Sequence, residues 1–464
     1  MIKLFNTLTR KKESFKSIIK NKASLYTCGP TVYWYAHLGN LRTYLFEDIL
    51  RRTLEYNGYK IKQVMNITDI EDKIIKKALQ ENKDIYAITK PYIKLFFDDL
   101  KKLNIEKAEK YPKAASHIKE MINIIKSLIK KGLAYKGEDG SVYFDISKYK
   151  NYGKLSRLDK EELKINARIS SDEYKKEEAQ DFVLWKNQAS EELKKIKAVW
   201  KSPWGWGRPG WHIECSAMAI KYLGKTFDIH CGAVDLIFPH HENEIAQSEG
   251  ATGKKFSNYW LHGEHLLING QKMSKSLGNF FTLRDIESAF NPLAFRYLVL
   301  TSHYRSKLNF TWESLQAAQN ALFRLNDELQ IMNYESLAKQ NKLTANKNLI
   351  IDYQKKFLSA INDDLNTPKA IALIWRIIKD DNLPSPVKKQ LILEFNKVLG
   401  LRLDKIKPIK IQKIPIKIKE MTEKREQLRR NQQFIPADLL RKKIEELGYV
   451  MEDTANGLKI KKSK

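Results

Sequence analysis

The sequence predicts an α/β protein built on a Rossmann-like, doubly wound parallel sheet. Lys22–Thr27 (KASLYT) and Ile61–Ile67 are typical of strands, and apolar residues recur at helical spacing from Leu41 to Leu54 between them. A strand, a helix and a second strand in this order form a βαβ unit with parallel strands. Cys28 follows the first strand and Thr68 follows the second. Open α/β sheets bind ligands at these carboxyl ends, so a site is expected there.

Length and charge set the broad class of the protein. The chain has 464 residues, of which 42% are hydrophobic, and this length allows roughly three domains. Its 83 lysines and arginines against 55 acids give a formal net charge of +28. That balance favours a polyanionic partner such as nucleic acid, although lysines spread over solvated helix faces would give the same count.

The same composition argues against a membrane or secreted protein. No apolar run reaches the ~18 residues of a membrane span, and Met1–Lys20 lacks the apolar core of a signal peptide. Three cysteines far apart in the sequence fit a reducing compartment better than a disulfide scaffold. We therefore expect no membrane association and a cytoplasmic location.

The stretch Gly232–Gly250 (GAVDLIFPHHENEIAQSEG) predicts a helix that carries half of a metal site. Pro239 suits a first helical position. Residues four apart share a helix face, so His240 and Glu244 can point the same way. A zinc site takes four ligands from cysteine, histidine and carboxylate side chains. The cysteines that could complete it are Cys28, Cys215 and Cys231.

Two other segments are candidates for contacts with a substrate. Ser202–Met218 (SPWGWGRPGWHIECSAM) sets tryptophans among prolines and glycines, as pocket walls or as ordinary core. Gly270–Asn279 (GQKMSKSLGN) is a loop with Lys272 and Lys275 that can close over phosphates or simply lie in solvent. Asn40 is a candidate for the cap of the helix that follows it. The parallel sheet is expected to resume near residue 205.

Five sequence blocks together indicate a known family. They are TCGPTVY at 27–33, NITDIEDK at 66–73, GRPGWHIECSAM at 207–218, FPHHENEIAQS at 238–248 and KMSKS at 272–276. In this order they resemble the cysteinyl-tRNA synthetases, a family of class I aminoacyl-tRNA synthetases. A lone KMSKS would be a weak signal, whereas the five blocks in family order are specific.

The resemblance implies an ATP-dependent ligase for L-cysteine. ATP, with Mg²⁺, would convert L-cysteine to cysteinyl adenylate and pyrophosphate, and the cysteine would then pass to the 3′ end of tRNA(Cys). One Zn²⁺ per chain would recognise the cysteine thiolate, and the family's usual form is a monomer. The implied zinc ligands are Cys28, Cys215, His240 and Glu244.

The resemblance also assigns the substrate residues. Those for ATP are His37, Gly39, Asn40, Lys272 and Lys275. The first signature is carried by Pro30, His37, Leu38, Gly39 and Asn40, and the second by Lys272, Met273, Ser274, Lys275 and Ser276. Those around bound cysteine are Gly29, Thr68, Trp211 and Asp235. In the first signature Asn40 stands where the family has a second histidine, and Cys231 stands where it usually has glycine, which suggests a small buried residue beside the site.

The domain order follows from the same comparison. We expect a discontinuous catalytic domain over 1–110 and 202–250, with an inserted connective domain over 111–201. A region of the KMSKS loop and stem contacts would span 251–310, a helix bundle 311–400, and a small basic anticodon-binding domain 401–464.

Two other functions remain open from the sequence. A related cysteine ligase makes the same adenylate but transfers cysteine to an amino sugar, and the basic segment 405–464 argues against it. A non-catalytic, zinc-stabilised RNA-binding protein would have no need for His37, Lys272 and Lys275 together. Cysteine-dependent ATP–pyrophosphate exchange separates the last possibility from the enzymes.

Overall fold

The computed structural model describes residues 1–157, 181–273, 279–338, 347–405, 416–454 and 457–462. The chain forms two compact units, Met1–Ile406 and Lys407–Lys464. In the ranges that are described, no helix is both long and apolar enough to cross a bilayer.

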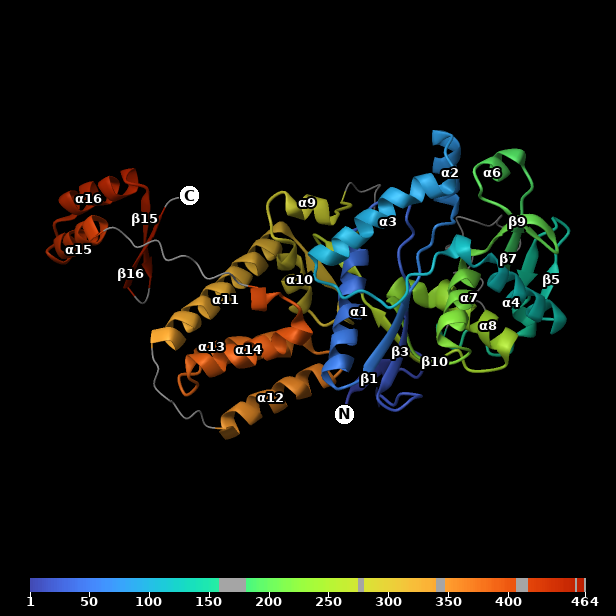
Figure 1. Ribbon diagram of the computed structural model, residues 1–464, viewed down its shortest axis with the longest axis horizontal. Coiled ribbons are helices and arrows are strands. Elements are labelled where there is room, and N and C mark those ends of the chain that lie inside the picture. The colour runs from blue at the N-terminus through green and yellow to red at the C-terminus, as the bar shows by residue number, and fades with distance from the viewer. Residues whose placement is uncertain (158–180, 274–278, 339–346, 406–415, 455–456, 463–464) are drawn as a thin grey trace. The chain divides into compact units, whose positions relative to one another are not determined.

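A four-stranded parallel sheet organises the first unit (Figure 1). Its strands are β3 (Lys22–Thr27), β4 (Lys60–Met65), β10 (Phe227–Ala233) and β11 (Ser257–Gly263), in the order β11-β10-β3-β4. The helix α1 (Leu38–Tyr56) connects β3 to β4. The predicted parallel βαβ unit is therefore confirmed.

Alternate residues of these strands belong to two separate cores. Leu25 and Ile229 pack with α1 residues such as Leu45, whereas Tyr26 and Trp260 pack on the other side with residues of α7 (Trp211–Leu223) and α8 (Glu242–Thr252). Successive side chains of a strand point to opposite faces, so the sheet is covered on both. This is the doubly wound, Rossmann-like class that the sequence predicts.

The strand order reverses between β3 and β10. From β3 the chain proceeds to β4 on one side, and from β10 it proceeds to β11 on the other. Open α/β sheets form their ligand crevice at such a switch point, outside the carboxyl ends of the strands.

The segment between β4 and α7 adds helices and an antiparallel sheet. Its helices are α2 (Asp72–Glu81), α3 (Ile85–Lys102), α4 (Ile118–Lys130) and α6 (Glu191–Lys195). Its sheet has the order β5-β6-β7-β9-β8, from β5 (Ala134–Lys136), β6 (Val142–Phe144), β7 (Phe182–Asn187), β8 (Trp200–Ser202) and β9 (Gly205–Pro209). The expectation that the parallel sheet resumes near residue 205 is wrong, because β9 pairs with β7 and β8 instead.

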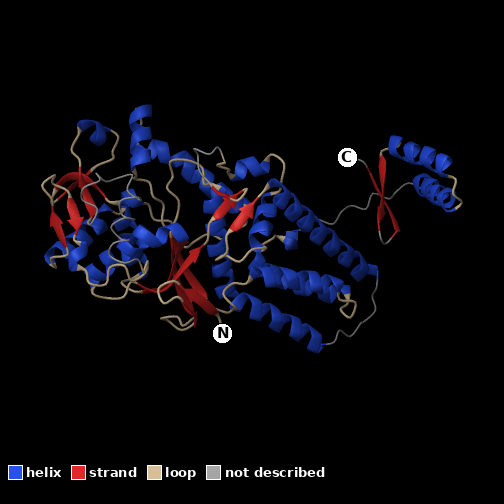
Figure 2. Ribbon diagram, turned by 180° about the vertical axis from the view of Figure 1, so that it is seen from behind, coloured by secondary structure: helices blue, strands red, loops and turns tan. Residues whose placement is uncertain are grey.

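The remaining parts of the first unit are a small sheet and a helix bundle (Figure 2). The small sheet contains β12 (Leu266–Ile268), β13 (Gln271–Lys272) and β14 (Leu308–Phe310), with α9 (Leu283–Glu287) and α10 (Pro292–Leu300) between β13 and β14. The bundle contains α11 (Trp312–Ala338), α12 (Lys347–Asn362), α13 (Thr367–Lys379) and α14 (Ser385–Leu399). Near the N-terminus, β1 (Lys3–Asn6) pairs with β2 (Lys11–Ser14).

The second unit is a helical pair with a hairpin. Its elements are α15 (Ile416–Arg430), α16 (Phe434–Glu446), β15 (Tyr449–Thr454) and β16 (Gly457–Lys462). In the hairpin, β15 and β16 pair in antiparallel fashion.

Candidate active site

The candidate site lies at the switch point of the parallel sheet. Cys28 follows β3, and its backbone N–H donates to the carbonyl of Cys231 on β10 at 3.2 Å. The segment after β10 turns back over this edge and continues into α8, and α7 brings a second buried cysteine to the same place. Three segments that are far apart in the sequence therefore converge here.

The four residues implied as zinc ligands come together in a buried cluster. His240 Nε2 lies 3.0 Å from Glu244 Oε1, and Cys28 Sγ lies 4.0 Å from the same oxygen. The Cys215 side chain hydrogen-bonds with both Cys28 and His240. All four side chains are at most 8% exposed.

The helix that carries His240 and Glu244 begins after a kink at Phe238. A single turn spans Ile237–His241 and contains Phe238 in an extended conformation, with φ −138° and ψ 133°. The residues after Phe238 have helical backbone angles and lead directly into α8, so the helical run begins at Pro239, as the sequence predicts. His240 and Glu244 are four residues apart in this run and therefore face each other.

Three more histidines contact this cluster, and sequence reasoning missed them. His241 Nε2 lies 3.2 Å from Cys28 Sγ, and the ligand atoms of Cys28, His240, His241 and Glu244 all lie within 4.8 Å of one another. His212 Nδ1 lies 2.9 Å from His240 Nδ1, and His230 Nε2 lies 2.9 Å from Glu244 Oε2. The sequence signal was the adjacent pair His240-His241 and the histidines directly beside each predicted ligand segment.

Burial and charge set the protonation of the cluster. Burial alone would raise the pKa of Glu244, but the neighbouring His230 and His240 lower it to about 2. Burial lowers the pKa of His240, and Glu244 and Cys215 outweigh this and raise it to about 10. Burial opposes ionisation of Cys215, whereas its contacts with Cys28 and His240 lower its pKa to about 6. These shifts favour an ionised Glu244 carboxylate, a protonated His240 imidazole and an ionised Cys215, whereas burial raises the pKa of the Cys28 thiol.

The first signature forms the start of α1. His37 is the N-cap of the helix and Asn40 is its third residue, so the prediction of Asn40 as the cap is wrong. The Asn40 N–H donates to His37 Nδ1 at 3.2 Å, and the His37 N–H donates to Asn40 Oδ1 at 3.3 Å. Leu38 is buried and its N–H donates to Phe281 O at 2.9 Å, which joins this loop to the segment after the second signature.

Of the residues expected around bound cysteine, Trp211 contacts the buried cluster directly. The Trp211 ring lies 4.3 Å from the His240 ring, centre to centre. Thr68 is buried and hydrogen-bonds the Glu214 side chain, and its N–H donates to Pro30 O at 3.0 Å. Asp235 lies in the short turn Val234–Leu236 with an exposed side chain.

Gly29 is required by a close approach of two chain segments. A Cβ at this position would lie 1.8 Å from the carbonyl oxygen of Asn66, and the Gly29 N–H donates to Asn66 Oδ1 at 2.9 Å. Any side chain would therefore push β3 away from the segment that follows β4.

The second signature is described only in part. Lys272 ends β13 with an exposed side chain, and Met273 packs against the core of the first unit. Ser274, Lys275 and Ser276 lie outside the described residues.

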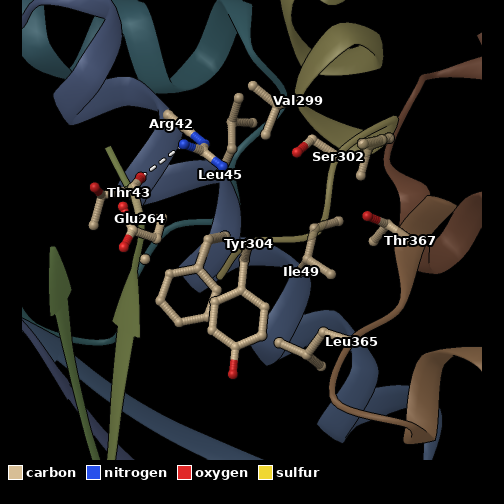
Figure 3. Close-up of a pocket in the computed structure, with 13 residues that line it drawn as sticks. Arg42, Thr43, Leu45, Ile49, Glu264, Val299, Ser302, Tyr304, Leu365 and Thr367 are labelled. Carbon is tan, nitrogen blue, oxygen red and sulfur yellow. Dashed lines mark hydrogen bonds between the residues drawn. The ribbon is translucent and has the colours of Figure 1, made fainter. Parts of the chain in front are cut away.

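One cavity lies on the α1 side of the sheet, away from the cluster (Figure 3). Arg42 enters it and donates to the carbonyl of Glu264 at 2.8 Å, and the rings of Phe46 and Tyr304 stack with centres 4.4 Å apart. None of the predicted site residues lines this cavity.

Comparison with known proteins agrees with this architecture. The family described as the catalytic domain of class I (C) tRNA synthetases matches residues 14–320, and the DALR domain matches residues 356–404. Among solved structures, the chain is similar to methionyl-tRNA synthetase of Mycobacterium tuberculosis in complex with methionyl-adenylate, with a TM-score of 0.61 and 14% identity over 83% of this chain and 93% of that one. The fold is that of a class I aminoacyl-tRNA synthetase.

Sequence relatives identify the family within the class I aminoacyl-tRNA synthetases. Cysteine–tRNA ligase of Protochlamydia amoebophila is 46% identical over 99% of this chain and 98% of its own length. That of Chlamydia felis is 47% identical over 99% and 97%. The chain belongs to the cysteine–tRNA ligase family.

Proposed function

We propose that this protein activates L-cysteine with ATP and transfers it to the 3′ end of tRNA(Cys). The observation that carries the proposal is the buried cluster of two cysteines, an imidazole and a carboxylate at the switch point, with the Trp211 ring packed against His240 beside it. This crevice is where a Rossmann-like sheet binds its ligands, and the cluster supplies soft donors that suit sulfur chemistry.

The cluster fits a zinc ion. Tetrahedral zinc with bonds of about 2.0–2.3 Å places its ligand atoms roughly 3.3–3.8 Å apart. The separations of 3.0 Å between His240 and Glu244 and of 4.0 Å between Cys28 and Glu244 are close to this range. We propose Cys28, Cys215, His240 and Glu244 as the ligands, with His241 as the alternative to Cys215.

Neighbouring histidines would orient two of these ligands. His212 contacts the ring nitrogen of His240 that faces away from Glu244, and His230 contacts the second oxygen of Glu244. Such outer contacts fix the tautomer and direction of a metal ligand. A bound zinc would supply a site for the substrate sulfur as thiolate, which serine could not match.

Cysteine and ATP would meet between this cluster and the start of α1. We propose that Gly29, Thr68, Trp211 and Asp235 surround the amino acid and that His37, Gly39, Asn40, Lys272 and Lys275 contact ATP. The carboxylate of cysteine would attack the α-phosphorus, forming the carboxyl–phosphate bond while the bond to the β-phosphate oxygen breaks and pyrophosphate leaves with Mg²⁺. Catalysis of this step depends mainly on positioning of the two substrates and on cations that stabilise the charge on the phosphate oxygens, so no nucleophilic side chain is needed.

The second step would use the terminal ribose of tRNA. Its hydroxyl attacks the carbonyl carbon of the adenylate, and AMP leaves. The second unit, with its two helices and a hairpin, comes directly after the DALR domain in the sequence. These additional domains support tRNA rather than an amino sugar as the acceptor of cysteine. We propose a monomer that acts in the cytoplasm, as the family resemblance implies.

The deciding experiment is cysteine-dependent ATP–pyrophosphate exchange, followed by charging of tRNA(Cys). Exchange with charging supports the proposal. Exchange without charging of any tRNA would favour the amino-sugar ligase, and absence of exchange in the zinc-loaded protein would favour a non-catalytic RNA-binding protein.

A further inference from the structure

Aromatic and cationic side chains gather where the loop between β3 and α1 passes α3. We call this set the Trp34 patch, and its members are Trp34, Tyr35, Lys77, Tyr92 and Arg284. The Trp34 ring lies 5.4 Å from the Tyr35 ring and 6.0 Å from the Tyr92 ring, centre to centre. Lys77 Nζ lies 5.1 Å from the Trp34 ring centre and donates to the Tyr92 hydroxyl at 2.6 Å.

A second cation completes the patch from α9. The guanidinium carbon of Arg284 lies 4.6 Å from the Tyr35 ring centre, and Asp99 holds this arginine at 3.1 Å. Three separate segments therefore fix the aromatic rings in place, so little conformational entropy would be lost when a ligand binds to them.

The patch is exposed although it is rich in aromatic surface. Trp34 is 41% exposed, while Tyr35 and Tyr92 are half-buried. Tryptophan usually buries its large ring, so an exposed tryptophan held between two tyrosines and a lysine is better suited to a ligand than to the core.

The position of the patch relates it to the proposed active site. Its loop is bounded at one end by a backbone bridge between Thr31 and Thr68 and at the other by one between His37 and Thr282. Trp34 therefore lies in the loop that leads from the end of β3 to the first turn of α1, three residues before His37. Arg284 follows Thr282 by two residues, on the segment after the second signature.

We propose that the Trp34 patch stacks an unpaired base of the tRNA 3′ end and directs that end into the active site. Single-stranded nucleic acid is bound where bases stack on aromatic rings and cations meet the backbone phosphates. Trp34 supplies the ring, Lys77 supplies a cation over that ring, and Arg284 supplies another over the neighbouring Tyr35. This inference rests on the proposed function, because a tRNA end must reach the site between these signatures.

Stacking can be measured directly with a fluorescent base. The probe is tRNA(Cys) with 2-aminopurine at one of the unpaired positions before the terminal adenosine, each position tested in turn. Wild-type protein should quench the fluorescence at one position, Trp34→Phe should retain most of the quenching, and Trp34→Ala should lose it. Phe323→Ala, which removes a 48% exposed aromatic ring of the helix bundle, is the matched control and should quench like wild type.

Kinetics separate this inference from the proposed function. Loss of one base–aromatic stack should raise the KM for tRNA about tenfold or more in Trp34→Ala. Cysteine-dependent exchange, which needs no tRNA, should change less than the charging reaction.

If wild-type protein shows no exchange, the proposed function fails. If exchange and charging are normal in wild type but Trp34→Ala keeps its quenching and its KM for tRNA, the inference fails. An equal loss of both activities with a lower melting temperature would show that the patch only stabilises the fold.

Discussion

His37 and Asn40 hold each other by reciprocal hydrogen bonds at the start of α1. The Asn40 N–H donates to His37 Nδ1 at 3.2 Å, and the His37 N–H donates to Asn40 Oδ1 at 3.3 Å. This is a capping box, in which two backbone N–H groups of the first turn are satisfied by side chains. Because His37 Nδ1 accepts a hydrogen bond, the neutral ring carries its proton on Nε2 and can present an N–H donor to a phosphate.

We expect Asn40→Ala to loosen the first turn of α1. The substitution removes the acceptor of the His37 N–H, and loss of one such hydrogen bond costs about 1 kcal/mol, or roughly a fivefold change in a local opening equilibrium. Hydrogen–deuterium exchange of a peptide covering residues 36–42 should therefore be faster in Asn40→Ala. Asn40→Asp retains an acceptor oxygen and should exchange like wild type. Equal exchange rates in all three proteins would show that the asparagine contributes nothing to the cap.

Metal analysis should identify the fourth ligand of the cluster. Cys215 contacts Cys28 and His240, whereas His241 contacts Cys28 and, through Nδ1, His262 at 2.8 Å. We expect Cys215→Ser to lose zinc on dialysis against a weak chelator and His241→Asn to keep about one zinc per chain. Cys231→Ser serves as the control because Cys231 packs in the other core. Retention by Cys215→Ser with loss by His241→Asn would reverse the assignment.

Asp99 should make stability depend on pH. Burial raises its pKa from 3.8 to about 6, although Arg284 lies beside it and opposes the shift. The folded protein therefore binds this proton more tightly than the unfolded chain, so the stabilisation is present in full below about pH 4 and is lost as pH rises through 6.

The experiment compares Asp99→Asn with wild type by urea unfolding between pH 4 and 7. Asparagine cannot ionise, so the free energy of unfolding of the variant minus that of wild type should increase with pH. The increase should be at most about 3 kcal/mol, because each pKa unit is worth about 1.4 kcal/mol. A difference that does not vary with pH would mean that Asp99 has its ordinary pKa.

The sequence predicted the sheet better than it predicted the site. Strand periodicity and the βαβ order are local signals, and they located β3 and α1 correctly. The expectation that the parallel sheet resumes near residue 205 was wrong because the sequence of a short strand such as β9 does not show which sheet the strand joins. Its pairing with β7 depends on contacts with distant residues. His212 and His230 were missed for a related reason, since they are near the cluster only after α7 and β10 have packed.

Truncation should separate the two reactions. The second unit begins at Lys407, whereas Leu401 and Leu403 are buried in the core of the first. A protein ending at Ile406 should therefore keep cysteine-dependent exchange and lose most of its tRNA charging. A protein ending at Gly400 would remove Leu401 and Leu403, so it should also melt at a lower temperature. Full charging by the protein that ends at Ile406 would show that the second unit does not bind tRNA.

Cobalt substitution should show how cysteine is distinguished from serine. The two amino acids differ by one atom, and an apolar pocket separates such pairs only about 10- to 200-fold. A metal held at Cys28, Cys215, His240 and Glu244 can favour cysteine much more strongly, because its thiol is softer and far more acidic than the serine hydroxyl and binds the metal as thiolate. We therefore expect a sulfur-to-cobalt charge-transfer band that grows when cysteine is added and does not grow with saturating serine. Trp211→Ala should weaken the response to cysteine, since this ring packs against His240, while the band of the two protein thiolates stays. An unchanged spectrum with cysteine demonstrably bound would exclude direct recognition of the sulfur by the metal.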